Sequence, residues 1–148
     1  MGGRRGGQGL IEVSLVPAAL VVIAAIEDLR RQRIPDPVVL AIAATSPLVA
    51  VLGGDRDIAW HLACGGGVLV IGLALAWVGW LGAGDAKLMA AVSCWTGFGG
   101  LVPFLCATAL SGALIALALL IAGRRHRGMP FAPAIAIGTL VAFLVPGA

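Results

Sequence analysis

Charged residues are scarce in this sequence. Asp, Glu, Lys and Arg together make up only 11% of its 148 residues, and tyrosine is absent. A soluble domain carries about 25% charged residues, so a chain of this composition cannot build a surface that faces water. The scarcity of charge excludes a soluble globular fold, and we expect no nucleic-acid partner.

Cysteine is also rare, with three residues in the whole chain. Cys64, Cys94 and Cys106 each stand alone inside an apolar stretch, without the spacing to a second ligand that metal sites use. An isolated buried cysteine ordinarily behaves as a small hydrophobic residue. We therefore expect neither a metal nor a cofactor.

Apolar residues, in contrast, make up 60% of the chain, and the mean hydropathy is +1.05. So short a chain cannot bury this much apolar surface within itself, so most of it must face a lipid bilayer. The predicted fold is all-α, a polytopic membrane helix bundle in a single transmembrane domain over residues 1–148, with residues 1–9 as a flexible N-terminal segment. The apolar runs predict six spans, at about residues 10–26, 38–52, 62–81, 86–95, 101–122 and 131–145. The fourth run is too short to cross a bilayer unless it continues through "TGFGG".

The basic residues predict the orientation of these spans. With six alternating helices, seven Lys and Arg residues fall on one side of the membrane and three on the other. Cytoplasmic loops carry the excess of positive charge, so the side with seven is predicted to be cytoplasmic and both termini to be outside. The seven are Arg30, Arg31, Arg33, Lys87, Arg124, Arg125 and Arg127, and the three are Arg4, Arg5 and Arg56.

Two acids, Asp28 and Asp85, fall at the same predicted membrane boundary although they are far apart in the sequence. Asp28 ends the first span and Asp85 opens the fourth, both on the basic side. Carboxylates at such a boundary are costly unless they pair, form hydrogen bonds or take part in chemistry. Neighbouring carboxylates can share one proton, so that one acts as an acid and the other as a base. The pattern predicts a pair that activates water against a peptide bond.

The stretch "GAGDAKL" surrounds the second of these acids. Gly82 and Gly84 are expected to allow backbone conformations closed to other residues and to leave room for an extended substrate strand. Asp85 lies in the first turn of a predicted helix, where the dipole favours an anion, with Lys87 nearby. This argument favours Asp85 as base and Asp28 as acid. The arginines that follow Asp28 argue the other way, and because the two titrations are coupled the assignment stays open.

Taken together, "DLRRQRIPD", "GAGDAKLMAA" and "MPFAPAIAIG" resemble the signature segments of the prepilin peptidases, bacterial intramembrane aspartyl proteases with a glycine-x-glycine-aspartate motif. In the first segment Asp36 stands where the family usually has asparagine. The matching positions are Asp28, Arg30, Ile34 and Pro35 in the first segment, Gly82, Gly84, Asp85, Lys87 and Leu88 in the second, and Pro130, Phe131, Pro133, Ala134 and Gly138 in the third.

The resemblance implies that Asp28 and Asp85 are the catalytic aspartates. It implies removal of a short basic leader from type IV pilin-like precursors at the cytoplasmic face of the cell membrane, with prepilins or pseudopilins as partners and no metal. Glu27 and Asp36 are the acids available to receive that basic leader. The sequence shows no insert with two Cys-x-x-Cys pairs, so it resembles the short form that serves Flp/Tad-type pili, without a methyltransferase part. The oligomeric state is left undetermined.

Two other functions compete with this one. The chain is alternatively a non-catalytic membrane protein of pilus assembly, or a small ion or proton transporter that uses intramembrane acids. A transporter is expected to place acids near the middle of the bilayer and often to repeat its topology. Because the two acids here lie at span ends and no repeat is visible, the sequence favours hydrolysis.

Overall fold

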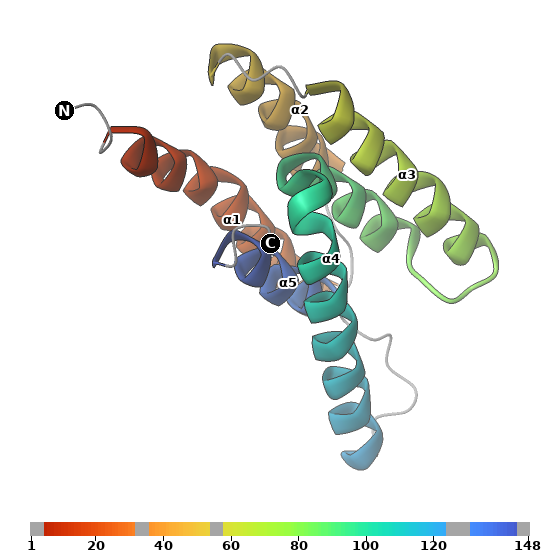
Figure 1. The fold of residues 1–148 in the computed structure, drawn as a ribbon. Coiled ribbons are helices and arrows are strands. Elements are labelled where there is room, and N and C mark those ends of the chain that lie inside the picture. The colour runs from red at the N-terminus through yellow and green to blue at the C-terminus, as the bar shows by residue number, and fades with distance from the viewer. Residues whose placement is uncertain (1–4, 32–35, 54–57, 124–130, 145–148) are drawn as a thin grey trace.

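The structure, a computed structural model, describes residues 5–31, 36–53, 58–123 and 131–144 of the chain (Figure 1). These residues form helices, with a short turn at residues 78–82 and no strand among them. The elements are α1 (Arg5–Arg31), α2 (Asp36–Gly53), α3 (Ile58–Trp77), α4 (Ala83–Ile121) and α5 (Ala132–Leu144). The predicted all-α class is confirmed.

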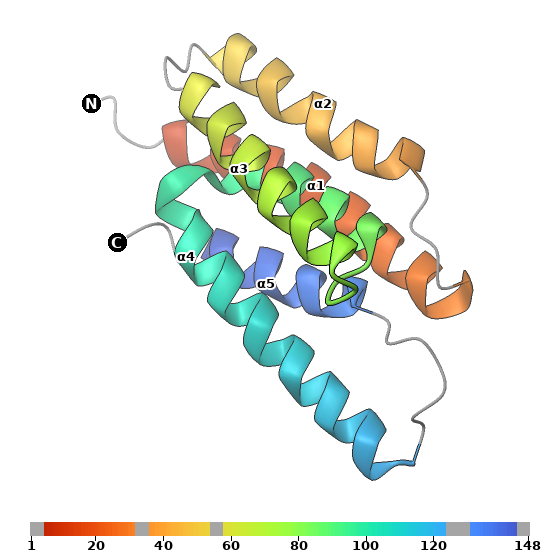
Figure 2. The same cartoon turned by 90° about the vertical axis from the view of Figure 1, so that its right-hand side faces the viewer.

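α4 is bent at Gly97, which divides it into two arms. Gly97 has φ 58° and ψ −166°, a backbone conformation that is essentially restricted to glycine. Figures 1 and 2 show that the second arm runs back from the bend in a different direction from the first. The predicted fourth and fifth spans are these two arms of one element. Six separate spans are therefore not confirmed, because a single glycine makes the turn that the sequence pattern assigned to a loop.

Side chains from α2 and α3 satisfy backbone groups next to this bend. The carbonyl oxygen of Cys94 accepts hydrogen bonds from Ser46 Oγ at 2.8 Å and from His61 Nδ1 at 2.9 Å. Trp95 Nε1 donates to the carbonyl of Ile42 at 2.9 Å. Bent helices lose internal hydrogen bonds, and in an apolar environment the freed groups need other partners. These contacts tie α2 and α3 to the first arm of α4.

Glycines let the helices approach closely. A Cβ atom added at Gly72 of α3 would lie 2.9 Å from the Cβ of Ala86 in α4, and one added at Gly112 would lie 2.7 Å from the ring of Phe131. Gly138 of α5 likewise lies directly against Thr108 of α4. Small residues at helix interfaces are typical of membrane bundles, where close van der Waals packing replaces the hydrophobic effect.

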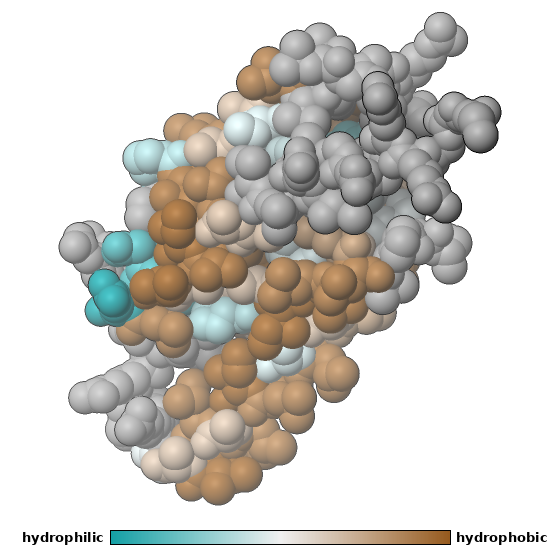
Figure 3. All heavy atoms as spheres, turned by 90° about the vertical axis from the view of Figure 1, so that its left-hand side faces the viewer, coloured by the Kyte–Doolittle hydropathy of each residue, from teal (hydrophilic) through white to brown (hydrophobic). Residues whose placement is uncertain are grey.

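The outside of the bundle is apolar. α3 and α4 are long and apolar enough to cross a bilayer, and only 17% of the most apolar window of each is buried. Figure 3 shows apolar atoms covering most of the coloured part of one face. Exposed large side chains on α3 and α4 include Val70, Ile71, Val102, Leu110, Leu114 and Ile121. This surface is the one expected of a helix bundle in lipid.

The helix ends that carry the motifs gather at one end of the bundle. The C-terminal ends of α1 and α3 lie toward the right of Figure 2, as do the N-terminal ends of α2, α4 and α5, while the bend of α4 lies toward the left. Helix ends that are far apart in the sequence are thus brought to the same end of the bundle. The candidate site lies there.

Candidate active site

Asp28 lies in the last turns of α1 and is 7% exposed. Its Oδ2 accepts a hydrogen bond of 3.2 Å from the backbone N–H of Ala132, the first residue of α5. The first N–H groups of a helix have no partner inside that helix, so the carboxylate satisfies a donor that would otherwise be unpaired in a buried place. The contact joins the C-terminal end of α1 to the N-terminal end of α5.

Asp85 lies in the first turn of α4 and is half-buried. Its carboxylate folds back and accepts a hydrogen bond from the backbone N–H of Gly82, the residue that precedes the helix. The carbonyl of Gly82 accepts the first hydrogen bond of the helix, from Ala86 N at 3.0 Å. An acid three residues after the N-cap commonly bonds back to the N-cap backbone in this way, so the helix start itself holds the carboxylate.

The two carboxylates lie close enough to interact electrostatically with each other. Each lies beside the N-terminal end of a helix, Asp85 at α4 and Asp28 at α5. The dipole argument made from the sequence placed Asp28 only at the C-terminal end of α1. Because the N-terminal end of α5 lies beside Asp28, the helix dipoles favour the ionised form of both acids. They therefore do not distinguish the acid from the base.

The glycines before Asp85 do not adopt the unusual backbone conformations that were expected of them. Gly82 has φ −73° and ψ 138°, a conformation open to any residue, and neither it nor Gly84 is among the described glycines with positive φ. What Gly82 supplies is space, since a Cβ atom there would lie 2.6 Å from Asp85 Oδ2. Both backbone groups of Gly82 already make one hydrogen bond within the chain. Its carbonyl oxygen has a second lone pair, so pairing with a substrate strand stays a prediction.

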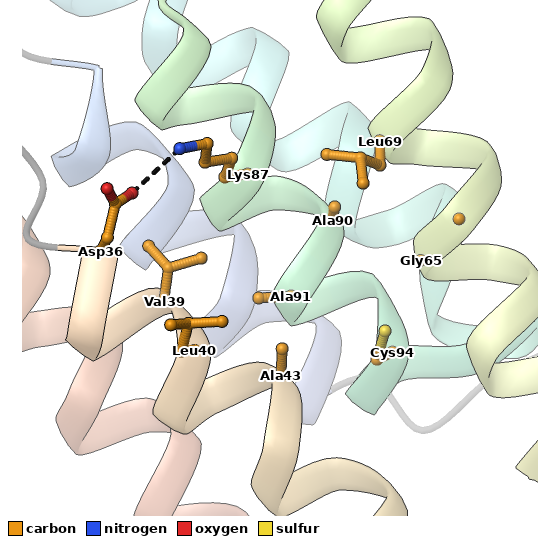
Figure 4. Close-up of a pocket in the computed structure, with 11 residues that line it drawn as sticks. Asp36, Val39, Leu40, Ala43, Gly65, Leu69, Lys87, Ala90, Ala91 and Cys94 are labelled. Carbon is orange, nitrogen blue, oxygen red and sulfur yellow. Dashed lines mark hydrogen bonds and ion pairs between the residues drawn. The ribbon is translucent and has the colours of Figure 1, made fainter.

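Lys87 and Asp36 form an ion pair, with Lys87 Nζ 3.0 Å from Asp36 Oδ1 (Figure 4). Both side chains are exposed, and the pair joins the start of α2 to the start of α4. Of the two acids expected to receive a basic leader, Asp36 therefore already has a cationic partner. Glu27 is half-buried on α1, next to Asp28. Ile34, Pro35 and Pro130 of the signature segments lie outside the described residues.

Within the described part of the chain, no group of three or more His, Cys, Asp or Glu residues is placed to hold a metal ion. Among the polar groups at this end of the bundle are two carboxylates that interact electrostatically, backbone N–H donors and one ion pair. This set can transfer protons and polarise a carbonyl group.

Comparison with known proteins identifies the family. The model of the type IV leader peptidase family matches residues 15–117, a span that contains both acids. The chain belongs to the type IV leader peptidase family. It is 32% identical over 144 residues to the prepilin leader peptidase/N-methyltransferase of Bacillus subtilis (strain 168), an alignment that covers 90% of this chain and 57% of that protein. No solved structure matches the chain.

One contact of this leader peptidase family member was not foreseen from its sequence. The segment "MPFAPAIAIG" resembled a family motif, but no role could be assigned to it from the sequence alone. In the structure this segment begins α5 and delivers the Ala132 N–H to Asp28. The signal available in the sequence was Pro133 at the second position of a helix, where proline is tolerated because the first N–H groups have no helical partner.

Proposed function

We propose that this chain is a membrane-embedded aspartic endopeptidase. It removes the short basic leader from type IV pilin-like precursors, those of Flp/Tad pili among them, at the cytoplasmic face of the cell membrane. The single observation that carries the proposal is that Asp28 and Asp85 lie near enough to interact electrostatically at one end of an apolar helix bundle. Membership of the type IV leader peptidase family supports it.

The proposed reaction is direct hydrolysis, without a covalent intermediate. One carboxylate takes a proton from a water molecule held between the two acids, and that water attacks the scissile carbonyl. The other carboxyl group, protonated, polarises the carbonyl oxygen and later protonates the leaving amine. The backbone N–H groups of Gly82 and Ala132 each fix one carboxyl group, so that both are oriented before substrate binds.

The substrate must be extended where it is cut, because a peptide bond inside a helix is shielded by its own hydrogen bonds. The cut at a membrane boundary fits this requirement, since the polar leader and the apolar helix of the precursor meet there. The position of the two acids at the ends of α1 and α4, rather than in the middle of a span, fits the same requirement.

Cleavage in cells tests the proposal. The chain is expressed with a pilin-like precursor that has a basic leader, and the ratio of precursor to product is compared for the wild type, Asp28→Asn and Asp85→Asn. General acid–base catalysis contributes about 10²–10⁴-fold, so each variant is expected to retain less than about 1% of the wild-type rate. Asp57→Asn, at an acid predicted to lie in the opposite loop, is the control and should cleave normally. Cleavage that survives both substitutions would exclude the aspartyl mechanism, and no cleavage by the wild type would favour the transporter or assembly alternatives.

A further inference from the structure

An apolar groove lies between α2 and α3, with the first arm of α4 as its floor. Its cavity volume is about 440 Å³. Figure 4 shows Val39 and Leu40 of α2 on one side and Leu69 of α3 on the other, with Ala90 and Ala91 of α4 between them. None of these side chains takes part in the chemistry proposed above, so the proposed hydrolysis does not explain the groove.

The groove begins at the end of the bundle that holds the carboxylates. The Asp36–Lys87 ion pair lines its mouth (Figure 4). The groove follows the face of α4 that carries Lys87, Ala90 and Cys94, because residues three, four and seven positions apart lie on the same side of a helix. Asp85, two positions before Lys87, lies on another face of α4. The groove therefore starts at the end of the bundle that holds the candidate site and runs into the apolar part of the bundle.

Its walls are built to accept another helix. Ala43, Gly65, Gly66, Ala90 and Ala91 all line it, and small residues on facing surfaces let helix backbones approach closely in lipid. A Cβ atom added at Gly66 would meet nothing within 4 Å, so this wall is open toward a partner. The mouth carries two exposed charges of opposite sign, which suits a partner whose apolar helix is followed directly by a charged segment.

We propose that this groove binds the apolar helix of the membrane-anchored substrate, with the charged segment next to that helix at the Asp36–Lys87 mouth. This inference rests on the proposed function. An apolar helix followed by a charged segment would lie with its junction at the mouth and its apolar part along α4. That placement brings the junction to the end of the molecule where Asp28 and Asp85 lie. An acyl chain would fill the same volume but has no need of close backbone approach.

Two neighbouring glycines provide a matched test. Gly66 lines the groove and Gly67 does not, yet both are exposed and a Cβ at either would meet nothing within 4 Å. Leucine at position 66 should fill the groove, whereas leucine at position 67 should point elsewhere. In detergent, with a precursor that carries a basic leader and one apolar helix, Gly66→Leu should raise KM about tenfold with kcat retained, as expected when only substrate binding is lost. Gly67→Leu should match the wild type.

Cross-linking gives a second measurement that does not depend on the bulky side chain. Cys64, Cys94 and Cys106 are replaced by alanine, Asp85→Asn stops turnover, and Gly66→Cys or Gly67→Cys is added. A precursor with one cysteine in its apolar helix should cross-link to Gly66→Cys and not to Gly67→Cys.

The outcomes distinguish a failure of the groove proposal from a failure of the proposed peptidase function. If the wild type cleaves the precursor but Gly66→Leu leaves KM unchanged and Gly66→Cys gives no cross-link, the groove inference is wrong and the peptidase proposal stands. Cross-links between two copies of the chain from Gly66→Cys, with or without precursor, would also overturn it. If the wild type itself cleaves nothing, the proposed function fails first.

Discussion

Gly82 has no side chain, and this absence leaves space for the Asp85 carboxylate. The Asp85 carboxylate folds back onto the Gly82 N–H, and there is no room for a Cβ atom between them. This explains why the motif has a glycine three places before the acid although the backbone there is ordinary. At this position the physical requirement is space next to a charged group.

Gly82→Ala should therefore impair cleavage without unfolding the protein. The new Cβ would lie 2.6 Å from Asp85 Oδ2, so the carboxylate must rotate away and lose its bond to the Gly82 N–H. A misplacement of about 1 Å in a catalytic group costs on the order of 10²-fold in rate. The rate of precursor cleavage and the thermal unfolding temperature in detergent are measured together, with Gly67→Ala as the control. An unchanged rate would show that the position of the Asp85 carboxylate is not critical.

The geometry of the site depends on two features of the helices. One is the bend in α4 and the other is the N-terminal end of α5. The bend returns the chain toward α5, and Ser111 Oγ of the second arm donates to the carbonyl of Ala134 at 3.3 Å. The start of α5 in turn meets Asp28. The packing of α5 against α4 through small residues thus brings the Ala132 N–H to the Asp28 carboxylate.

Ala132→Pro should remove this donor and keep the helix. Ala132 is the first residue of α5, a position where proline is well tolerated because no helical hydrogen bond is lost. Proline has no N–H, so Asp28 loses its partner, and hydrogen bonds to charged groups contribute about 1.5–3 kcal/mol. We expect cleavage to fall by roughly ten- to a hundredfold, measured as kcat on a precursor substrate. Ala132→Gly, which keeps the N–H, should stay near the wild-type rate, and an equal loss in both variants would contradict the role of the N–H.

Gly97→Ala should destabilise the bundle. The left-handed conformation at Gly97 costs a residue with a side chain about 1–3 kcal/mol, and the added Cβ would lie 2.9 Å from the His61 ring. That contact would also disturb the hydrogen bond from His61 to Cys94. The free energy of unfolding, followed by circular dichroism in detergent, should fall by about 2 kcal/mol or more. Gly67→Ala again serves as the comparison, and equal stability of the two variants would show that the bend relaxes freely.

Seen as a whole, the molecule is an apolar bundle with its candidate chemistry at one end. The ion pair, both carboxylates and the start of α5 lie at that end, while the bend of α4 lies at the other (Figure 2). Large exposed apolar side chains lie on α3 and on the second arm of α4, which runs back from the bend. This division fits a bundle that crosses a bilayer and works at one of its surfaces.

The orientation of the bundle in the membrane is open to a direct test. The excess of basic residues predicts that the end with the carboxylates faces the cytoplasm. In a chain without its native cysteines, Asp57→Cys should react with a membrane-impermeant maleimide added to intact cells, and Arg125→Cys should react only after the membrane is permeabilised. The reverse pattern would place the candidate site outside and contradict the proposed cleavage at the cytoplasmic face.

The sequence predicted the helical class and the pair of acids, because both depend on local information. Runs of apolar residues require helices in lipid, and an acid at each of two helix ends is visible in the chain itself. The sequence separated α4 into two apolar runs but did not predict that a single glycine makes the turn between them. "TGFGG" has the composition of a loop, and only the packing of His61 and Ser46 around the Cys94 carbonyl shows that one glycine is sufficient for the turn.

By itself, then, the sequence determined that the chain is helical and apolar. It also placed two carboxylates at helix ends on the same predicted side of the membrane. The tertiary structure alone decided that the Ala132 N–H bonds to Asp28, that Lys87 pairs with Asp36, and that an apolar groove opens at the same end of the bundle. The reason is physical. Helix formation and hydropathy depend on neighbours along the chain, whereas these contacts join helices far apart in the sequence, whose approach is set by which small residues meet across their interfaces.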